Sequence, residues 1–343
     1  MQIIISIFFT ILVFGILILV HESGHFLVAK ACKVKVNEFS IGMGPAIIKK
    51  QGKKTLYCLR ALPIGGFVQM DGEDGDGTDE NSFNKKPRWQ RFLILFAGAA
   101  LNVILGFLII CIINFFTVKY LPTNIIAEFD DNAVSNSCGL KVGDDIVKIN
   151  NYKISNQYDY ATILGTNGVK PVDITVVRDG KEVVIKNVKF VEVENEDLGK
   201  IFKLDFKVYP QKLGFFGVIK YSFDETVSVS KSIYDFIGKI FTGSADINQV
   251  SGPVGTSAAI GESVKYGFDS LMLMMAIISV NLGVVNLLPF PALDGGRILV
   301  LIIEAIRRKP LNPKVETAIN AVGLVLLLLL MVLISFKDVI KLF

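Results

Sequence analysis

The 343-residue chain has few cysteines, and their positions argue against two common uses of that residue. The four cysteines have neither zinc-finger spacing nor a pair that would share an oxidising compartment. They are Cys32, Cys58, Cys111 and Cys138. We therefore expect neither a disulfide framework nor a zinc finger.

The chain also lacks features that would indicate a phosphate or nucleic-acid ligand. It has no evident Gly-rich loop that could cradle a phosphate. Charged residues make up 20% of the chain, and the formal net charge is only +4. We expect no nucleic-acid partner.

Apolar residues dominate the chain instead: hydrophobic residues account for 51% of it, and its mean hydropathy is +0.51. Four apolar segments are long enough to cross a hydrocarbon core of about 30 Å. The first lacks the basic start and the cleavage site of a signal peptide, so we expect it to be retained. The sequence predicts a polytopic α-helical membrane protein, in the lipid bilayer, with about four transmembrane helices at Ile3–Ala29, Phe92–Val118, Leu271–Leu288 and Ala318–Phe336.

Basic residues are distributed unevenly between the connecting segments. Residues 30–92 hold 12 basic and 7 acidic side chains, and several Lys and Arg also follow the third apolar segment. Residues 118–270 hold 17 basic and 20 acidic side chains. Because cytoplasmic loops accumulate Lys and Arg, we expect the two basic loops inside and residues 118–270 outside, with both termini.

The two histidines of the chain stand four residues apart at the end of the first apolar segment, in His21-Glu22-Ser23-Gly24-His25. Residues i and i+4 share one helical face, so both imidazoles can bind one metal ion. Zinc with an open position lowers the pKa of water to about 7, and Glu22 can serve as the base. The small Gly24 would let another chain segment approach closely. This pattern predicts a zinc protease centre within a membrane helix.

The same pattern also arises by chance, and a helix can simply end in polar residues at the membrane surface. Charged residues at the membrane centre cost about 2.5 to 3.5 kcal/mol each on insertion scales. Polar residues that cluster at the spacing of metal ligands are therefore more readily explained by a function than by chance.

A catalytic zinc ion needs one more protein ligand, and the absence of further histidines favours a carboxylate. Asp294 is the candidate, in the segment Asn281-Leu-Gly-Val-Val-Asn-Leu-Leu-Pro-Phe-Pro-Ala-Leu-Asp-Gly-Gly296. Prolines and glycines interrupt this apolar segment, and broken backbone at membrane depth requires protein or water to satisfy its polar groups. Asp294 could instead, or in addition, cap a helix expected to begin near Arg297.

Residues 54–70 alternate partly in polarity and carry turn residues at Pro63, Gly65 and Gly66. We expect them to form a membrane-associated β-hairpin of two short strands. Residues 71–80 resemble a calcium loop in composition, but the flanking helices and the closing Glu are missing. We expect a solvated acidic loop there.

The outside segment contains a run, Gly139-Leu-Lys-Val-Gly-Asp-Asp-Ile146, that resembles a PDZ domain. A helix near Tyr158–Leu164 and two strands joined at Asp179-Gly180 are expected to follow, since Asp-Gly is a strong hairpin signal. The resemblance implies an inserted α+β domain that captures an extended peptide by strand addition.

The segment after this domain carries aromatic and aliphatic residues at roughly helical spacing between Gly214 and Phe241. A helix on the outer membrane surface and a helix packed against the PDZ-like domain are both open interpretations. The expected division is 1–118, first part of the membrane core; 119–210, PDZ-like domain; 211–270, amphipathic linker; and 271–343, second part of the membrane core.

Together, His-Glu-Ser-Gly-His on a first span, Asn-Leu-Leu-Pro-Phe-Pro-Ala-Leu-Asp-Gly-Gly on a third and a PDZ-like domain between them resemble the site-2 intramembrane metalloproteases. The likeness covers nearly the whole chain and is closest to the bacterial proteases that regulate sigma factors. It implies the following site: His21, His25 and Asp294 as ligands of one Zn²⁺, Glu22 as general base, Asn286 and Asn281 on the substrate backbone or oxyanion, and Gly65, Gly66 and Phe67 on a strand that pairs with unwound substrate.

The resemblance also implies partners and a location. The expected substrates are single-span membrane proteins, such as anti-sigma-factor-like proteins or signal-peptide remnants, already cut once outside the membrane. The expected location is the bacterial cytoplasmic membrane, with the active site nearer the cytoplasmic side. Two other functions stay open at this point, a catalytically inactive PDZ scaffold and a metal transporter that uses the same ligands.

Overall fold

The computed structural model describes residues 2–73, 75, 77, 79–167, 169–195, 199–243, 250–309 and 311–341. Within the described residues the chain forms two compact units. We call Met1–Leu108 with Ser251–Phe343 the membrane unit, and Ile109–Val250 the sheet unit. The division falls within the helix Arg88–Phe116, and each unit has its own core.

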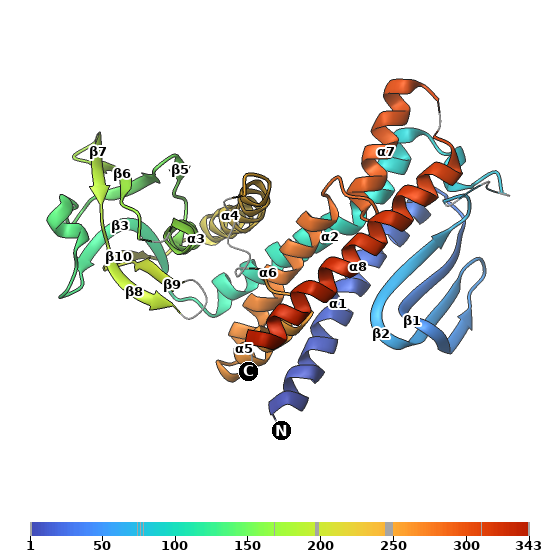
Figure 1. Ribbon diagram of the computed structural model, residues 1–343, viewed down its shortest axis with the longest axis horizontal. Coiled ribbons are helices and arrows are strands. Elements are labelled where there is room, and N and C mark those ends of the chain that lie inside the picture. The colour runs from blue at the N-terminus through green and yellow to red at the C-terminus, as the bar shows by residue number, and fades with distance from the viewer. Residues whose placement is uncertain are drawn as a thin grey trace. The chain divides into compact units, whose positions relative to one another are not determined.

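Helices and strands alternate irregularly along the chain (Figure 1). The α-helices are α1 Gln2–Ala31, α2 Arg88–Phe116, α3 Gln157–Asn167, α4 Phe215–Phe241, α5 Pro253–Lys265, α6 Phe268–Asn286, α7 Asp294–Arg307 and α8 Pro313–Lys341. The strands are β1 Val36–Gln51, β2 Leu56–Met70, β3 Leu121–Phe129, β4 Asp145–Ile149, β5 Tyr152–Lys153, β6 Val172–Arg178, β7 Lys181–Val188, β8 Val191–Asn195, β9 Gly199–Lys203 and β10 Phe206–Gln211. Two 3₁₀ turns complete the set, Phe83–Lys85 and Ser135–Cys138.

Among the described residues, four helices are long and apolar enough to cross a membrane, as predicted. The qualifying spans are Ile4–Ala31, Arg88–Phe116, Phe268–Asn286 and Lys314–Ile340. The protein is therefore a multi-pass membrane protein. The fourth span is longer at both ends than expected, because the helix continues into flanking turns that hold charged residues such as Glu316 and Lys337.

Small residues let the helices of the membrane unit pack closely. A Cβ added to Gly24 would lie 2.4 Å from the carbonyl oxygen of Ala97, so Gly24 permits contact between α1 and the backbone of α2. A Cβ added to Gly283 would lie 2.7 Å from the carbonyl oxygen of Ala99, so this glycine lets α6 contact the same stretch of α2. Helix α2 is thus held between α1 and α6, as the site requires.

A short helix not foreseen from the sequence completes the membrane unit. Helix α5 packs against α1, α6 and α8 (Figure 1). Its first turn is fixed by Asp338 of α8, whose Oδ2 accepts hydrogen bonds of 2.8 Å from the backbone N–H groups of Gly252 and Gly255. The compact membrane unit thus includes residues 251–270, which the sequence analysis had placed in the linker.

Residues 54–70 were expected to form a hairpin of two short strands, but residues 56–70 form the single bent strand β2, whose partner is β1. Strands β1 and β2 pair antiparallel, with several changes of register. Residues 36–41 of β1 align with both ends of β2, and Ser40 has Cys58 and Phe67 as its two partners. Gly65 has a φ of +76°, so the backbone bends where turn residues were expected. The sequence analysis missed β1, which supplies the pairing partner for both halves of β2.

The second half of β2 lies at an edge of this sheet. Residues 66–70 pair with residues 36–41, and no further described strand is aligned with them. The sheet packs on α1 through a core that includes Val36, Val68 and Met70. Burial of each such side chain stabilises the fold by about 1.5–3 kcal/mol. The edge is therefore held firmly beside α1.

The acidic loop after β2 is only partly solvated. Asp71 is buried, and its Oδ2 accepts hydrogen bonds from the hydroxyl of Ser82 and from the backbone N–H of Asp79. Glu73 forms an ion pair with Arg297 of α7. Residues 74, 76 and 78 of the loop lie outside the described residues. The expectation of a fully solvated loop is therefore wrong for Asp71 and Glu73.

The sheet unit is built on a sheet with the strand order β10-β3-β4-β6-β7, in which β5 also pairs with β4. Strands β8 and β9 form a separate two-stranded sheet. The predicted helix is α3, and the predicted hairpin is β6–β7, turning at Asp179 and Gly180 with φ values of +49° and +75°. These elements agree with an α+β domain, and the assignment to the PDZ class stays a prediction.

Helix α4 packs against the rest of the sheet unit along one face. Asn156 donates a 2.9 Å hydrogen bond to the buried hydroxyl of Ser228, and Asn114 donates a 2.8 Å hydrogen bond to Glu225. Burial raises the pKa of Glu225, and the hydrogen bond from Asn114 acts in the opposite direction. The other face of α4 exposes aromatic rings such as Phe216, which is 82% exposed. Packing within the unit is thus confirmed, and a contact with the membrane surface stays a prediction.

Asp144, from the Gly-Asp pair of the PDZ-like run, holds a loop of the sheet unit in place. Asp144 is 1% exposed and accepts two 2.7 Å hydrogen bonds from the guanidinium of Arg178. It also accepts a 2.8 Å hydrogen bond from the backbone N–H of Lys141. The carboxylate therefore fixes the loop before β4 to the end of β6.

Removal of the Asp144 carboxylate is expected to destabilise the sheet unit. We expect Asp144→Ala to cost about 2–4 kcal/mol, because a buried N–H and a guanidinium lose their acceptor. Proteolysis of the full-length protein at increasing urea would measure the change. The control is Glu128→Ala, which removes an exposed ion pair with Lys207. It should leave the urea concentration at the midpoint of unfolding unchanged. Equal midpoints for both variants would contradict the assigned role.

Candidate metal centre and active site

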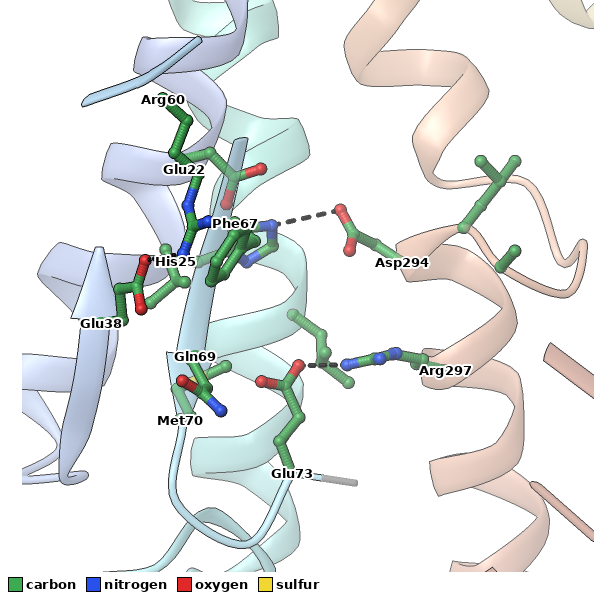
Figure 2. Close-up of a pocket in the computed structure, with 14 residues that line it drawn as sticks. Glu22, His25, Glu38, Arg60, Phe67, Gln69, Met70, Glu73, Asp294 and Arg297 are labelled. Carbon is green, nitrogen blue, oxygen red and sulfur yellow. Dashed lines mark hydrogen bonds and ion pairs between the residues drawn. The ribbon is translucent and has the colours of Figure 1, made fainter. Parts of the chain in front are cut away.

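Three side chains from two distant parts of the chain converge in the membrane unit. His21 and His25 lie one helical turn apart on α1, and Asp294 is the first residue of α7. One ligand atom from each residue lies within 4.8 Å of the others, and the structure holds no other such group among the residues it describes. Figure 2 shows Asp294 pointing across the pocket toward His25.

The atoms that converge are the two Nε2 nitrogens and the Oδ2 oxygen. The Nε2 atoms of His21 and His25 are 3.2 Å apart. They lie 3.2 Å and 3.4 Å from Oδ2 of Asp294, respectively. Ligands of one tetrahedral zinc ion stand about 3.3–3.6 Å from one another, given metal–ligand distances of about 2.0–2.2 Å. The spacing therefore fits a zinc ion.

The surroundings of Asp294 also indicate a cation. Its Oδ2 atom is buried and makes no hydrogen bond within the described part of the chain. A buried carboxylate oxygen without a donor is costly unless a positive charge faces it. The helix does not use Asp294 as its N-cap, because that position belongs to Leu293 and α7 begins at Asp294 itself. The capping alternative is not what the structure shows.

Each histidine is held from α2 through its outer ring nitrogen. Nδ1 of His25 lies 2.8 Å from the carbonyl oxygen of Ile94. Nδ1 of His21 lies 3.3 Å from the side-chain nitrogen of Asn102, which is fully buried. Gly98 lies between these two residues and permits the imidazole of His25 to contact the backbone of α2. The sequence analysis assigned none of these residues to the site.

Glu22 lies beside the converging atoms and opposite the edge strand. It lines a pocket of about 560 Å³ together with His25, Asp294 and Phe67. A Cβ added to Gly66 would lie 3.0 Å from Cγ of Glu22, so the edge strand and the carboxylate are neighbours. Figure 2 shows the Glu22 carboxylate near the imidazole of His25, on the side of the pocket that faces Asp294.

Two ion pairs border this pocket. Arg60 donates a 2.6 Å hydrogen bond to Glu38, and its guanidinium lies 5.1 Å from the ring centre of Phe67. Partial burial opposes ionisation of Glu38, but hydrogen bonds led by the one from Arg60 outweigh it and lower the pKa of Glu38. On the opposite side Glu73 pairs with Arg297, one turn after Asp294 on α7 (Figure 2).

Of the remaining predicted residues, two lie apart from the pocket and three lie on the hairpin beside it. Asn281 and Asn286 are both half-buried on α6 and do not line the described pocket. Gly65 precedes the edge strand and lies near the side chain of Met43. Gly66 and Phe67 begin the edge strand, as the predicted substrate contact would require.

The pair between Glu73 and Arg297 should help to hold Asp294 in place. We expect Arg297→Met to lower peptide turnover by up to about 10-fold, because α7 loses its link to the loop after β2. The charge swap Glu73→Arg with Arg297→Glu should recover most of the loss, with a coupling energy of about 0.5–3 kcal/mol. Turnover and zinc content of the two single variants and the double variant would measure this. If the losses of Glu73→Arg and Arg297→Glu simply add in the double variant, the two side chains are not coupled and the pair does not hold Asp294 in place.

A His-Glu-x-x-His helix, a converging carboxylate and four candidate membrane spans define a membrane-embedded metallopeptidase. The sequence profile of Peptidase family M50, the site-2 proteases, matches residues 9–330, and the chain belongs to this family.

Relatives carry the same activity in their names. A Clostridium acetobutylicum protein named as a zinc metalloprotease is 36% identical over 336 residues, covering 98% of this chain and 97% of the relative. The Regulator of sigma-W protease RasP of Bacillus subtilis is 30% identical over 417 positions, covering 97% of this chain and 98% of RasP. Zinc metalloprotease RasP of Bacillus licheniformis is 29% identical, with the same coverage. The protein is accordingly a zinc metalloprotease of the membrane. This result favours neither of the two other functions left open by the sequence, an inactive scaffold and a metal transporter.

Proposed function

We propose that this protein cuts the membrane-spanning segments of single-span proteins or of signal-peptide remnants. The observation that carries the proposal is that Asp294 converges with His21 and His25, whose helix α1 itself qualifies as a membrane span. RasP of Bacillus subtilis is named for regulating a sigma factor, which supports anti-sigma-factor-like substrates for this chain as well.

In the proposed site, His21, His25 and Asp294 hold the zinc ion, one per chain. When bound, zinc supplies a Lewis acid that polarises the scissile carbonyl. Glu22 takes a proton from the attacking water and returns it to the nitrogen of the leaving amine. Its place beside His25 and Gly66 puts the carboxylate between the ligands and the edge strand, where both transfers are required.

Substrate binding is proposed to use the free edge at residues 66–70. A transmembrane helix hides its carbonyl groups in internal hydrogen bonds, so cleavage needs local unwinding and new backbone partners. An edge strand provides such partners by strand addition, with Gly66 next to Glu22 and Phe67 in the pocket. Contacts of Asn286 and Asn281 with the substrate backbone or the oxyanion remain part of the proposal for the substrate-bound state.

We further propose that the substrate has already been trimmed outside the membrane. In this scheme the PDZ-like domain excludes bulky, uncut ectodomains. The enzyme would lie in the bacterial cytoplasmic membrane with both termini and this domain outside and the active site nearer the cytoplasm. The excess of basic residues in 30–92 supports that orientation.

The test is a cleavage assay of tagged single-span proteins in cells that carry either the wild-type enzyme or Glu22→Gln. Fragments mapped by mass should place the cut within the apolar segment and should disappear with the variant. A fragment that persists would belong to another enzyme. Deletion of residues 120–210 tests the exclusion step, because an untrimmed substrate should then be cut faster, and an unchanged rate would end that part of the proposal.

A further inference from the structure

The two histidines use their ring nitrogens in the same way. Both Nε2 atoms face Asp294, at 3.2 Å and 3.4 Å. Both Nδ1 atoms face α2, one at the carbonyl oxygen of Ile94 and the other at the side chain of Asn102. The inner nitrogens thus meet the candidate metal position, and the outer nitrogens meet the neighbouring helix.

The outer partner decides which nitrogen carries the proton. A neutral imidazole has one N–H group and one lone pair. The carbonyl of Ile94 can only accept, so Nδ1 of His25 carries the proton and Nε2 keeps the lone pair that a metal needs. The partner of His21 is an amide, which can either donate or accept.

The amide of Asn102 fits its cavity in two orientations, because its oxygen and nitrogen are nearly equal in size. With Nδ2 facing His21, the amide donates to Nδ1 and leaves the imidazole proton on Nε2, directed at Asp294. With Oδ1 facing His21, the amide accepts a hydrogen bond from a protonated Nδ1, which leaves the lone pair on Nε2. The second arrangement is the one in which both histidines can bind zinc.

The setting of Asn102 argues for a role at the site over a role in helix association. Its side chain is fully buried within an apolar span, where an amide is costly. Within the described residues its hydrogen-bond partner is His21, and the Oδ1 atom has none. Its backbone carbonyl accepts a 2.7 Å hydrogen bond from Ser279 of α6, which fixes this turn of α2. Its bond to the neighbouring helix α1 is therefore made to a candidate zinc ligand, and the described residues give it no other side-chain partner.

We propose that Asn102 is a positioning residue that accepts a hydrogen bond from Nδ1 of His21 and so keeps the lone pair of Nε2 available for zinc. Asn102 does for His21 what the carbonyl of Ile94 does for His25. The inference rests on the proposed assignment of His21 as a zinc ligand. Outer partners of this kind orient a histidine and typically change metal affinity by 10–100-fold when removed.

The first test measures zinc affinity of the purified full-length enzyme by competition with a chelator. We expect Asn102→Leu, which keeps the shape and removes the acceptor, to bind zinc about 10–100-fold more weakly. Asn102→Asp retains an acceptor and should stay within about threefold of the wild type. Ser263→Ala is the matched control, since it removes a buried hydrogen bond within α5 of the same unit and should leave zinc affinity unchanged. Wild-type affinity in Asn102→Leu would overturn the inference.

The second test does not depend on the folding of any variant. The chain has two histidines, so ¹⁵N-histidine labelling gives spectra of only two imidazoles. In the zinc-loaded wild type both Nδ1 atoms should be protonated and both Nε2 atoms unprotonated. A His21 ring without a proton on Nδ1 would overturn the inference even if zinc is bound. A wild type that binds no zinc at all would instead refute the assigned ligands, so the two failures are distinguishable.

Discussion

Glu22→Gln is expected to lower peptide turnover by about 10²–10⁴-fold while the enzyme keeps its zinc. The amide has the shape of the carboxylate but cannot accept a proton from water, which removes the general base. Glu22 is not one of the three residues whose ligand atoms converge, so metal binding should be unaffected. Cleavage of a single-span substrate in proteoliposomes, with elemental analysis of the same sample, would measure both properties.

The matched control for this change is Glu262→Gln on α5. Glu262 is exposed, forms an ion pair with Lys265 one turn away and does not line the pocket of the site. Turnover of this variant should equal that of the wild type. If Glu22→Gln kept more than about a tenth of the wild-type turnover, another group would have to serve as the base. If it lost its zinc, the carboxylate would belong to the ligand set.

The parts of the site that are local in sequence could be predicted without a structure. His21 and His25 share a helical face because they are four residues apart, and length and hydropathy identify the helix that carries them. The chemistry of zinc left a carboxylate as the missing ligand in a chain with two histidines, and the interrupted apolar segment made Asp294 the candidate. The spacing of the three ligand atoms in the structure agrees with that reasoning.

The sheet beside the site was harder to predict because its pattern is irregular. Gly42 and Gly44 adopt φ values of +85° and +83° within β1, and the register with β2 shifts repeatedly. A strand bent in this way does not alternate regularly between a buried and an exposed face. The partner strand was therefore missed, although the bend near Gly65 was expected.

The supporting residues of the site were missed for a different reason. Glu73 and Arg297 are 224 positions apart, and no local pattern connects them. Asn102 did carry a signal, since an amide within an apolar span is unusual. That signal indicates a use but not the partner, which depends on how α1 and α2 pack. Packing of this kind is set by small residues such as Gly24 and Gly98.

Gly98→Ala should abolish tight zinc binding, although it adds only one methyl group. A Cβ at this position would lie 2.3 Å from Nε2 of His25, 2.7 Å from Cε1 and 2.8 Å from Cδ2. Carbon atoms rest about 3.5–4.0 Å apart, so the imidazole would have to move by about 1 Å or more. It cannot simply rotate away, because its Nδ1 is hydrogen-bonded to Ile94 at 2.8 Å.

The displaced nitrogen is the one that faces Asp294, so the strain falls on the ligand set itself. We expect zinc affinity and turnover each to fall by at least about 10²-fold, the loss typical of a misplacement of about 1 Å. Chelator competition on the full-length enzyme would measure the affinity. Gly15→Ala is the control: it lies on α1 with no atom within 4 Å of the added methyl group, and it should retain zinc while its helix gains up to about 1 kcal/mol. Unchanged affinity in Gly98→Ala would mean that His25 is not held against α2, and the placement of both imidazoles by that helix would then be wrong.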